Sequence, residues 1–96
     1  MEIGYKLEEQ RKKAGYTQAE AADLLGISRS TLIRYENDYE MPAMNTFLKM
    51  SKLYDFDVYD VLGVNDPLYD TMDDGARSEL RQAHIEYMER HSADKE

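Results

Sequence analysis

The most constraining feature of the sequence is a pair of short helical segments separated by almost no connecting chain. Thr17 and Glu20 form a capping box, in which the side chain of each residue bonds the backbone of the other at the start of a helix. Gly26 favours the positive backbone dihedral that ends a helix, and Ser28 is the next capping residue. The sequence therefore predicts two short helices that pack closely against each other.

Small and apolar residues in this pair indicate which faces meet. Ala22 is small where the second helix of the pair, from about Ser28 to Tyr35, is expected to cross the first. Leu32 and Tyr35 are three residues apart, so they share the face that packs on the first helix. The opposite, outward face carries Arg29, Ser30, Ile33 and Arg34.

Helical patterns continue on both sides of the pair, and no strand pattern interrupts them. Apolar residues at helical spacing predict a helix from about residue 3 that ends at Gly15. After a loop that ends at Pro42, an apolar stripe predicts a helix over about 43–54. Asp57 can cap a short helix over 58–62, which Gly63 ends. The expected fold is all-α, with five helices in a domain spanning residues 1–63.

Beyond that domain we expect a linker and one more helix. The composition of residues 64–72 favours turns, whereas residues 73–96 carry an amphipathic helical pattern to about His91. Its apolar positions approach the spacing of a coiled-coil seam. These positions are Ala76, Leu80, Ala83, Tyr87 and His91. This additional C-terminal helix would either dimerise or fold back onto helices one and five of its own chain.

Length and composition set limits on the class of protein. A chain of 96 residues has room for one core, and the absence of cysteine excludes disulfides and thiolate metal sites. No apolar run is long enough to cross a bilayer, and residues 1–6 do not resemble a secretion signal. We therefore expect no membrane association and a cytoplasmic protein.

The charge balance is acidic, with 12 Lys and Arg against 20 Asp and Glu and a net charge of −8. Residues 1–40 hold six basic and eight acidic side chains, and residues 41–96 hold six and twelve. Most of the excess negative charge therefore lies in the part of the sequence after the helix pair. An acidic chain that binds DNA should make few phosphate contacts and bind random DNA modestly.

The segment over 17–37, read as TQAEAADLLGISRSTLIRYEN, resembles the phage repressor and Cro-like helix-turn-helix family, also known from xenobiotic response element proteins. The resemblance extends over roughly residues 3–63, where cap, small residue, turn and packing residues occur in register. It implies a five-helix repressor-like DNA-binding domain whose third helix enters the major groove of double-stranded DNA. Residues 64–96 are not covered.

The resemblance also assigns roles to individual residues. Gln18 and Ser28 would contact phosphates, and Arg29, Ser30 and Arg34 would reach base edges. Thr31 would lie near the DNA backbone, and Ile33 could contact a thymine methyl group. The expected DNA-binding residues are therefore Gln18, Ser28, Arg29, Ser30, Thr31, Ile33, Arg34 and Asn37.

Two further expectations follow from the comparison with this family. It implies a buried pair between Arg11 and Glu36 that orients the reading helix without touching DNA. In the loop after that helix, where the family commonly carries Gly and basic residues, the sequence has Asp38, Tyr39 and Glu40. These acids would face phosphates, so backbone contacts from this loop are in question and affinity would depend more on dimerisation.

The sequence thus predicts a homodimeric, sequence-specific transcriptional regulator, most simply a repressor. The alternative is a protein-binding module with the same fold, such as an antitoxin or an accessory regulator with a protein partner. No phosphate loop or nucleophile pattern occurs, so we expect no enzymatic activity and no cofactor. His84 and His91 are seven residues apart, which does not match the spacing of metal-binding histidines, so no metal site is expected either.

Overall fold

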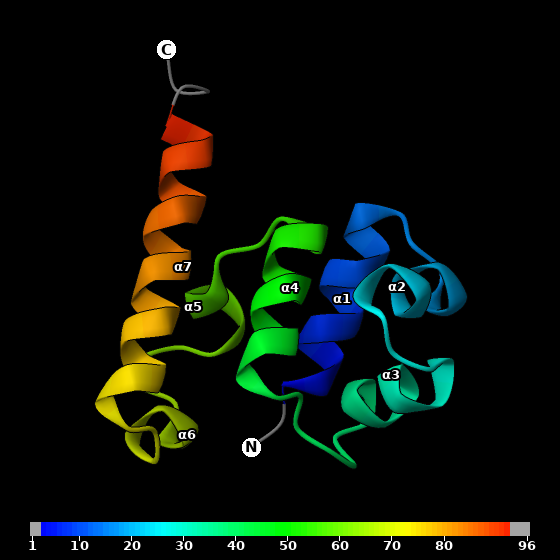
Figure 1. Cartoon of the computed structure of the whole chain (residues 1–96), viewed down its shortest axis with the longest axis horizontal. Helices are drawn as coiled ribbons and strands as arrows, with labels where there is room; N and C mark the ends of the chain where they lie inside the picture. The colour runs from blue at the N-terminus through cyan, green and yellow to red at the C-terminus, as the bar shows by residue number, and fades with distance from the viewer. Residues whose placement is uncertain (1–2, 93–96) are drawn as a thin grey trace.

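The computed structural model describes residues 3–92, which form seven helices and no strand (Figure 1). The all-α prediction is confirmed. The helices, in chain order, are α1 (Gly4–Ala14), α2 (Gln18–Leu25), α3 (Arg29–Glu36), α4 (Met44–Tyr54), α5 (Val58–Val61), α6 (Pro67–Asp70) and α7 (Asp74–Ser92). In Figure 1, α2 and α3 lie at one end of the molecule and α7 at the other, with α1 and α4 between them.

The helix pair forms through the local signals expected from the sequence. Thr17 Oγ1 accepts a hydrogen bond from the Glu20 amide at 3.1 Å, and Glu20 Oε1 accepts one from the Thr17 amide at 2.9 Å. Gly26 has a φ of 74°, the left-handed conformation that allows the chain to leave α2 after its last residue. Ser28 Oγ then accepts from the Thr31 amide at 3.0 Å and caps α3. The turn between α2 and α3 is therefore fixed by its own sequence.

The core lies where α1, α2, α3 and α4 meet. Leu7 of α1, Leu32 of α3 and Met50 of α4 are completely buried, and Ala21 and Ala22 of α2 pack beside them. The small side chains of α2 allow α3 to approach closely, as the sequence predicted. The core thus holds the inner face of α3 against α1 and α2.

The predicted helices over 43–54 and 58–62 are observed as α4 and the four-residue α5. Asp57 Oδ1 accepts from the Tyr59 amide at 3.1 Å, so the predicted cap of α5 is confirmed. Val58, Val61 and Leu62 are buried, so this short helix contributes to the core. The chain of α5 then continues into residues 64–72.

Residues 64–72 differ from the expected linker, because they contain α6 and pack against the core. Asp66 Oδ1 accepts from the Leu68 amide at 3.0 Å, and Pro67 occupies the first helical position. Leu68, Tyr69 and Met72 are partly buried against the core. An Asp-Pro pair begins a helix as readily as it begins a turn, and only tertiary contacts decide between the two.

Helix α7 folds back onto its own chain, where it packs on α5, as one of the two alternatives expected, and on α4 in place of helix one. Leu80, at the centre of the expected seam, is completely buried in the core, and Ala83 packs beside it. His84 Nδ1 lies 2.8 Å from Asp57 Oδ2, and Arg90 Nη2 lies 3.2 Å from Asp55 Oδ1. The seam is therefore occupied within the chain; residues 93–96 of the expected segment lie outside the described residues.

None of the helices within residues 3–92 combines the length and apolar character that a membrane crossing requires. The most apolar surfaces of the described helices instead face the core.

Candidate nucleic-acid interface

Helix α3 is seated on the domain by one face. Leu32, Tyr35 and Glu36 are buried and contact the region of α1 and α2. The sequence predicted the positions of Leu32 and Tyr35 from their spacing. Because the buried residues lie in both turns of this eight-residue helix, its outer face has a fixed orientation.

The outer face of α3 carries the polar side chains that the sequence placed there. Arg29, Ser30 and Arg34 are exposed, while Thr31 and Ile33 are half-buried. Two arginines and a serine on one face are donors that can pair with base edges in the major groove. The structure therefore brings together the residues predicted to read bases.

Arg11 of α1 and Glu36 of α3 form the buried pair that the family resemblance implied. Arg11 Nε donates to Glu36 Oε2 at 2.6 Å, and Arg11 Nη2 donates to Glu36 Oε1 at 3.1 Å. Arg11 Nη1 also donates to the carbonyl of Tyr16 at 2.8 Å. The hydrogen bonds to Glu36 raise the pKa of Arg11, against the opposing effect of its burial. This two-bond pair ties the C-terminal turn of α3 to α1.

Gln18, predicted to contact a phosphate, lies at the junction between this buried pair and the outer face of α3. Its Nε2 donates to Glu36 Oε1 at 3.2 Å, and its Oε1 accepts from Arg29 Nη2 at 3.4 Å. The half-buried amide therefore links Arg29 to Glu36 and Arg11. Sequence reasoning missed this role, because the hydrogen-bonded pairs are 11, 18 and 25 positions apart along the chain.

Ser28 and Asn37 stand at the two ends of α3. The Ser28 hydroxyl donates to Thr31 Oγ1 at 2.9 Å while it caps the helix, so its exposed oxygen already has two partners within the protein. Asn37 is exposed, and its backbone N–H donates to the carbonyl of Ile33 at 3.0 Å. The side chain of Asn37 therefore projects at the boundary between α3 and the following loop.

The acidic loop after α3 has a structural role that the sequence did not indicate. Asp38, which has a φ of 62°, turns its carboxylate toward α1, where Oδ1 accepts from the Gly4 amide at 2.9 Å. A Cβ at Gly4 would lie 2.4 Å from the carbonyl oxygen of Glu36, so glycine is needed for this close approach. Asp38 thus caps α1 instead of facing outward, whereas Glu40 lies beside Arg34, with Arg34 Nε 3.3 Å from Glu40 Oε1.

Ionisable side chains also meet where α7 packs on α5. Within residues 3–92, no group of three or more His, Asp or Glu side chains is arranged to hold a metal ion. His84 and Asp57 form a contact between α7 and α5, and the His84 ring packs on Tyr59 with ring centroids 4.7 Å apart. These contacts hold α7 against α5.

Two short helices joined by a glycine turn, with a buried ion pair behind the second and two arginines in front of it, define a helix-turn-helix domain. Residues 7–61 match the helix-turn-helix family, which is more than half of the chain. The chain therefore belongs to this family and is of the Cro and C1 type.

Individual relatives are transcriptional regulators. The chain is 48% identical over 63 residues to the HTH-type transcriptional regulator ImmR of Bacillus subtilis (strain 168), which covers 66% of this chain and 50% of ImmR. It is 32% identical over 63 residues to the cryptic phage CTXphi transcriptional repressor RstR of Vibrio cholerae serotype O1 (strain ATCC 39315 / El Tor Inaba N16961), covering 66% of this chain and 56% of RstR. The similarity to the HTH-type transcriptional regulator AnsR of Bacillus subtilis (strain 168) is 36% over 58 residues, or 60% of this chain and 50% of AnsR. The chain thus spans about half the length of these relatives.

Proposed function

We propose that this protein is a DNA-binding transcriptional regulator, most simply a repressor, that inserts α3 into the major groove of double-stranded DNA. The observation that carries the proposal is the two-sided character of α3, with Leu32 and Tyr35 buried and Arg29 and Arg34 exposed. The names of the relatives, among them a phage repressor, support the same class of function. We also propose that the protein acts in the cytoplasm, and the role requires neither a cofactor nor catalysis.

In this proposal Arg34 and Arg29 each pair with a base edge, Ser30 supplies a further polar contact, and Ile33 meets a thymine methyl group. Ser28 and Thr31 approach phosphates at the start of α3, and Asn37 approaches them at its end. Gln18 contacts a phosphate with the amide hydrogen that is not directed at Glu36, and it also positions Arg29. Phosphate contacts set the position of α3 along the groove, and base contacts select the sequence.

We further propose that the protein binds DNA as a homodimer through a surface near α3 rather than through α7. In Figure 1, α7 lies at the opposite end of the molecule from α3. Because the molecule is 36 Å long, a dimer formed by the outer face of α7 would hold the two α3 helices much farther apart than one turn of DNA, about 34–36 Å. A contact closer to α3 avoids this mismatch.

An apolar hollow beside the loop after α3 fits that requirement. It has a volume of about 170 Å³ and is lined by Met41, Pro42, Met44, Phe47, Leu62 and Met72. Met41 is 41% exposed at its rim. Apolar surface of this kind is typical of the centre of a protein interface. A Met41→Gln variant, which makes the hollow polar without adding charge beside the DNA, should therefore form weaker dimers in sedimentation experiments. It should bind a two-half-site duplex less tightly, while binding a single half-site unchanged.

Selection of bound sequences from a random pool of duplexes tests the whole proposal. We expect enrichment of a pseudo-palindrome whose half-sites are centred about one helical turn apart. Enrichment of single half-sites would argue against the dimer but not against DNA reading. A protein that retains no duplex at low salt would contradict the DNA-binding function itself, and would favour the alternative of a protein-binding module with the same fold.

A further inference from the structure

The contact between Arg34 and Glu40 brings a base-reading candidate and an acid together on the exposed surface. Arg34 Nε lies 3.3 Å from Glu40 Oε1, and the two side chains are 59% and 46% exposed. Glu40 belongs to the loop after α3, and Arg34 to the last turn of that helix. An acid at this position is unexpected next to a DNA-binding surface, because phosphates repel it.

The two acidic residues of this loop, Asp38 and Glu40, differ in whether the local fold requires them. Asp38 is committed to α1, because its carboxylate caps the Gly4 amide at 2.9 Å. Among the described residues, Glu40 forms an ion pair with Arg34 but no hydrogen bond that would hold a helix or a turn together. A role in the local fold therefore accounts for Asp38 and leaves Glu40 unexplained.

The geometry of this ion pair affects the two kinds of DNA contact differently. Within residues 3–92 no hydrogen bond holds the Arg34 guanidinium, and the contact with Glu40 is at Nε, so the two terminal nitrogens remain available although Glu40 compensates the charge. A contact with a guanine edge depends on the directions of the donors, whereas attraction to phosphate depends mainly on net charge. Glu40 thus weakens the attraction of Arg34 to any phosphate more than its ability to read a base.

We propose that Glu40 is a specificity-determining positioning residue, which restrains Arg34 and lowers binding to random DNA relative to the preferred site. This inference rests on the proposed DNA-binding function. This role also gives a reason for an acidic side chain beside α3, in a chain whose net charge of −8 already disfavours binding to phosphates. The residue acts through Arg34 and does not itself contact a base.

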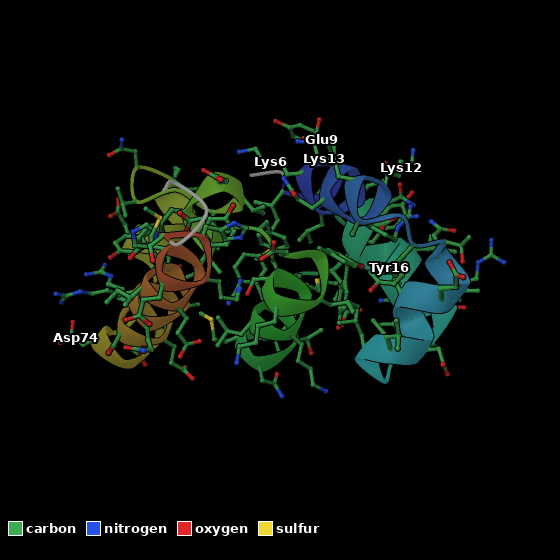
Figure 2. The ribbon with its side chains drawn as sticks, turned by 90° about the horizontal axis from the view of Figure 1, so that it is seen from above. Lys6, Glu9, Lys12, Lys13, Tyr16 and Asp74 are labelled. Carbon is green, nitrogen blue, oxygen red and sulfur yellow. The ribbon has the colours of Figure 1, made fainter. Side chains whose placement is uncertain are left out.

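The test compares Glu40→Gln with the wild type by fluorescence anisotropy on the selected duplex and on a scrambled duplex. Removing the ion pair should tighten binding to the scrambled duplex by about two- to fivefold, the range expected for an exposed pair, with a smaller gain on the selected one. The ratio of the two affinities should therefore fall. The matched control is Glu9→Gln, which makes the same chemical change on the outer face of α1, away from α3 (Figure 2).

A double-substitution cycle separates an action through Arg34 from a general effect of charge. In an Arg34→Ala background, Glu40→Gln should no longer change the affinity ratio. The inference would be overturned if Glu40→Gln left the affinity ratio unchanged. It would also be overturned if the ratio changed equally in Glu9→Gln and in the Arg34→Ala background. Either result would leave the proposed DNA-binding function standing. Failure of every variant and of the wild type to bind duplex would overturn the proposed function together with it.

Discussion

Arg11 and Glu36 join α1 to the end of α3 through two hydrogen bonds, at 2.6 and 3.1 Å, and both residues are at least 94% buried. Glu36 also accepts from Gln18, which in turn bonds Arg29 on the outer face of α3. The reading helix is thus connected to the interior by a continuous set of polar contacts. Removing one member would leave its partner buried without compensation.

We therefore predict that Glu36→Ala lowers the free energy of unfolding by about 3–5 kcal/mol, because Arg11 would keep a buried charge. Replacing both residues, as in Arg11→Met with Glu36→Leu, should recover most of this loss, since apolar pairs of similar volume replace buried ion pairs well. Urea unfolding measures both changes. A loss no greater than that of Glu9→Ala, at an exposed acid of α1, would mean that the pair does not hold α3 in place.

Tyr54 should make the protein sensitive to alkaline pH. Its hydroxyl is buried without a hydrogen-bond partner within the described residues, and burial, with Glu36 as a second cause, raises its pKa from 10.0 to about 12. The unfolded chain then loses this proton at lower pH than the folded one. Folding stability should therefore be intact below pH 10 and decrease between pH 10 and about 12, by about 2–3 kcal/mol in total.

The variant Tyr54→Phe isolates this effect from the ionisation of the other tyrosines. Because it removes an unsatisfied buried hydroxyl, we expect a stability equal to or above that of the wild type at neutral pH. In urea unfolding at alkaline pH, its stability should decline less steeply with pH than that of the wild type. Identical slopes for the two proteins would contradict a buried, protonated Tyr54.

Helix α7 should contribute to the stability of the monomer. Leu80 is completely buried against α4 and α5, so Leu80→Ala should cost about 2–5 kcal/mol in thermal or urea unfolding. The control is Ile85→Ala on the same helix, where the side chain is 37% exposed and the loss should be small. If Leu80→Ala weakened only self-association and left monomer stability unchanged, α7 would be a dimerisation element after all.

Gly4 should tolerate no side chain, because a Cβ would lie 2.4 Å from the backbone oxygen of Glu36. Gly4→Ala is expected to destabilise the fold by about 1–3 kcal/mol, since α1 and α3 must move apart. Gly75→Ala is the comparison: there a Cβ meets only the Asp73 carboxylate at 3.4 Å, within α7, so the change should be neutral or stabilising. Equal effects of the two substitutions in urea unfolding would argue against this close contact between α1 and α3.

The helices near α3 could be predicted from the sequence because their ends are set locally. Thr17, Gly26 and Ser28 each act within four residues of their own position, and all three behave as expected. The outward face of α3 follows from helical periodicity alone. The class of protein could be predicted for the same reason, since the motif is contiguous.

The contacts between distant segments could not be predicted in this way. The cap of Gly4 by Asp38 spans 34 positions, and the contact of His84 with Asp57 spans 27. The spacing of apolar residues in α7 predicted which face of the helix is buried, but not the surface against which it packs. Dimerisation and folding back onto the same chain require the same pattern. Residues 64–72 likewise carry signals for both a turn and the start of α6, and packing decided between them.

The most direct test of the account is the affinity of Arg34→Ala for the selected duplex and for a scrambled duplex of equal length and charge. If Arg34 reads a base from the outer face of α3, the substitution should cost about 1–3 kcal/mol on the selected duplex and much less on the scrambled one. Sequence preference should relax at a single base pair in each half-site. An equal loss on both duplexes would make Arg34 a phosphate contact, and an unchanged affinity on both would remove α3 from the DNA interface.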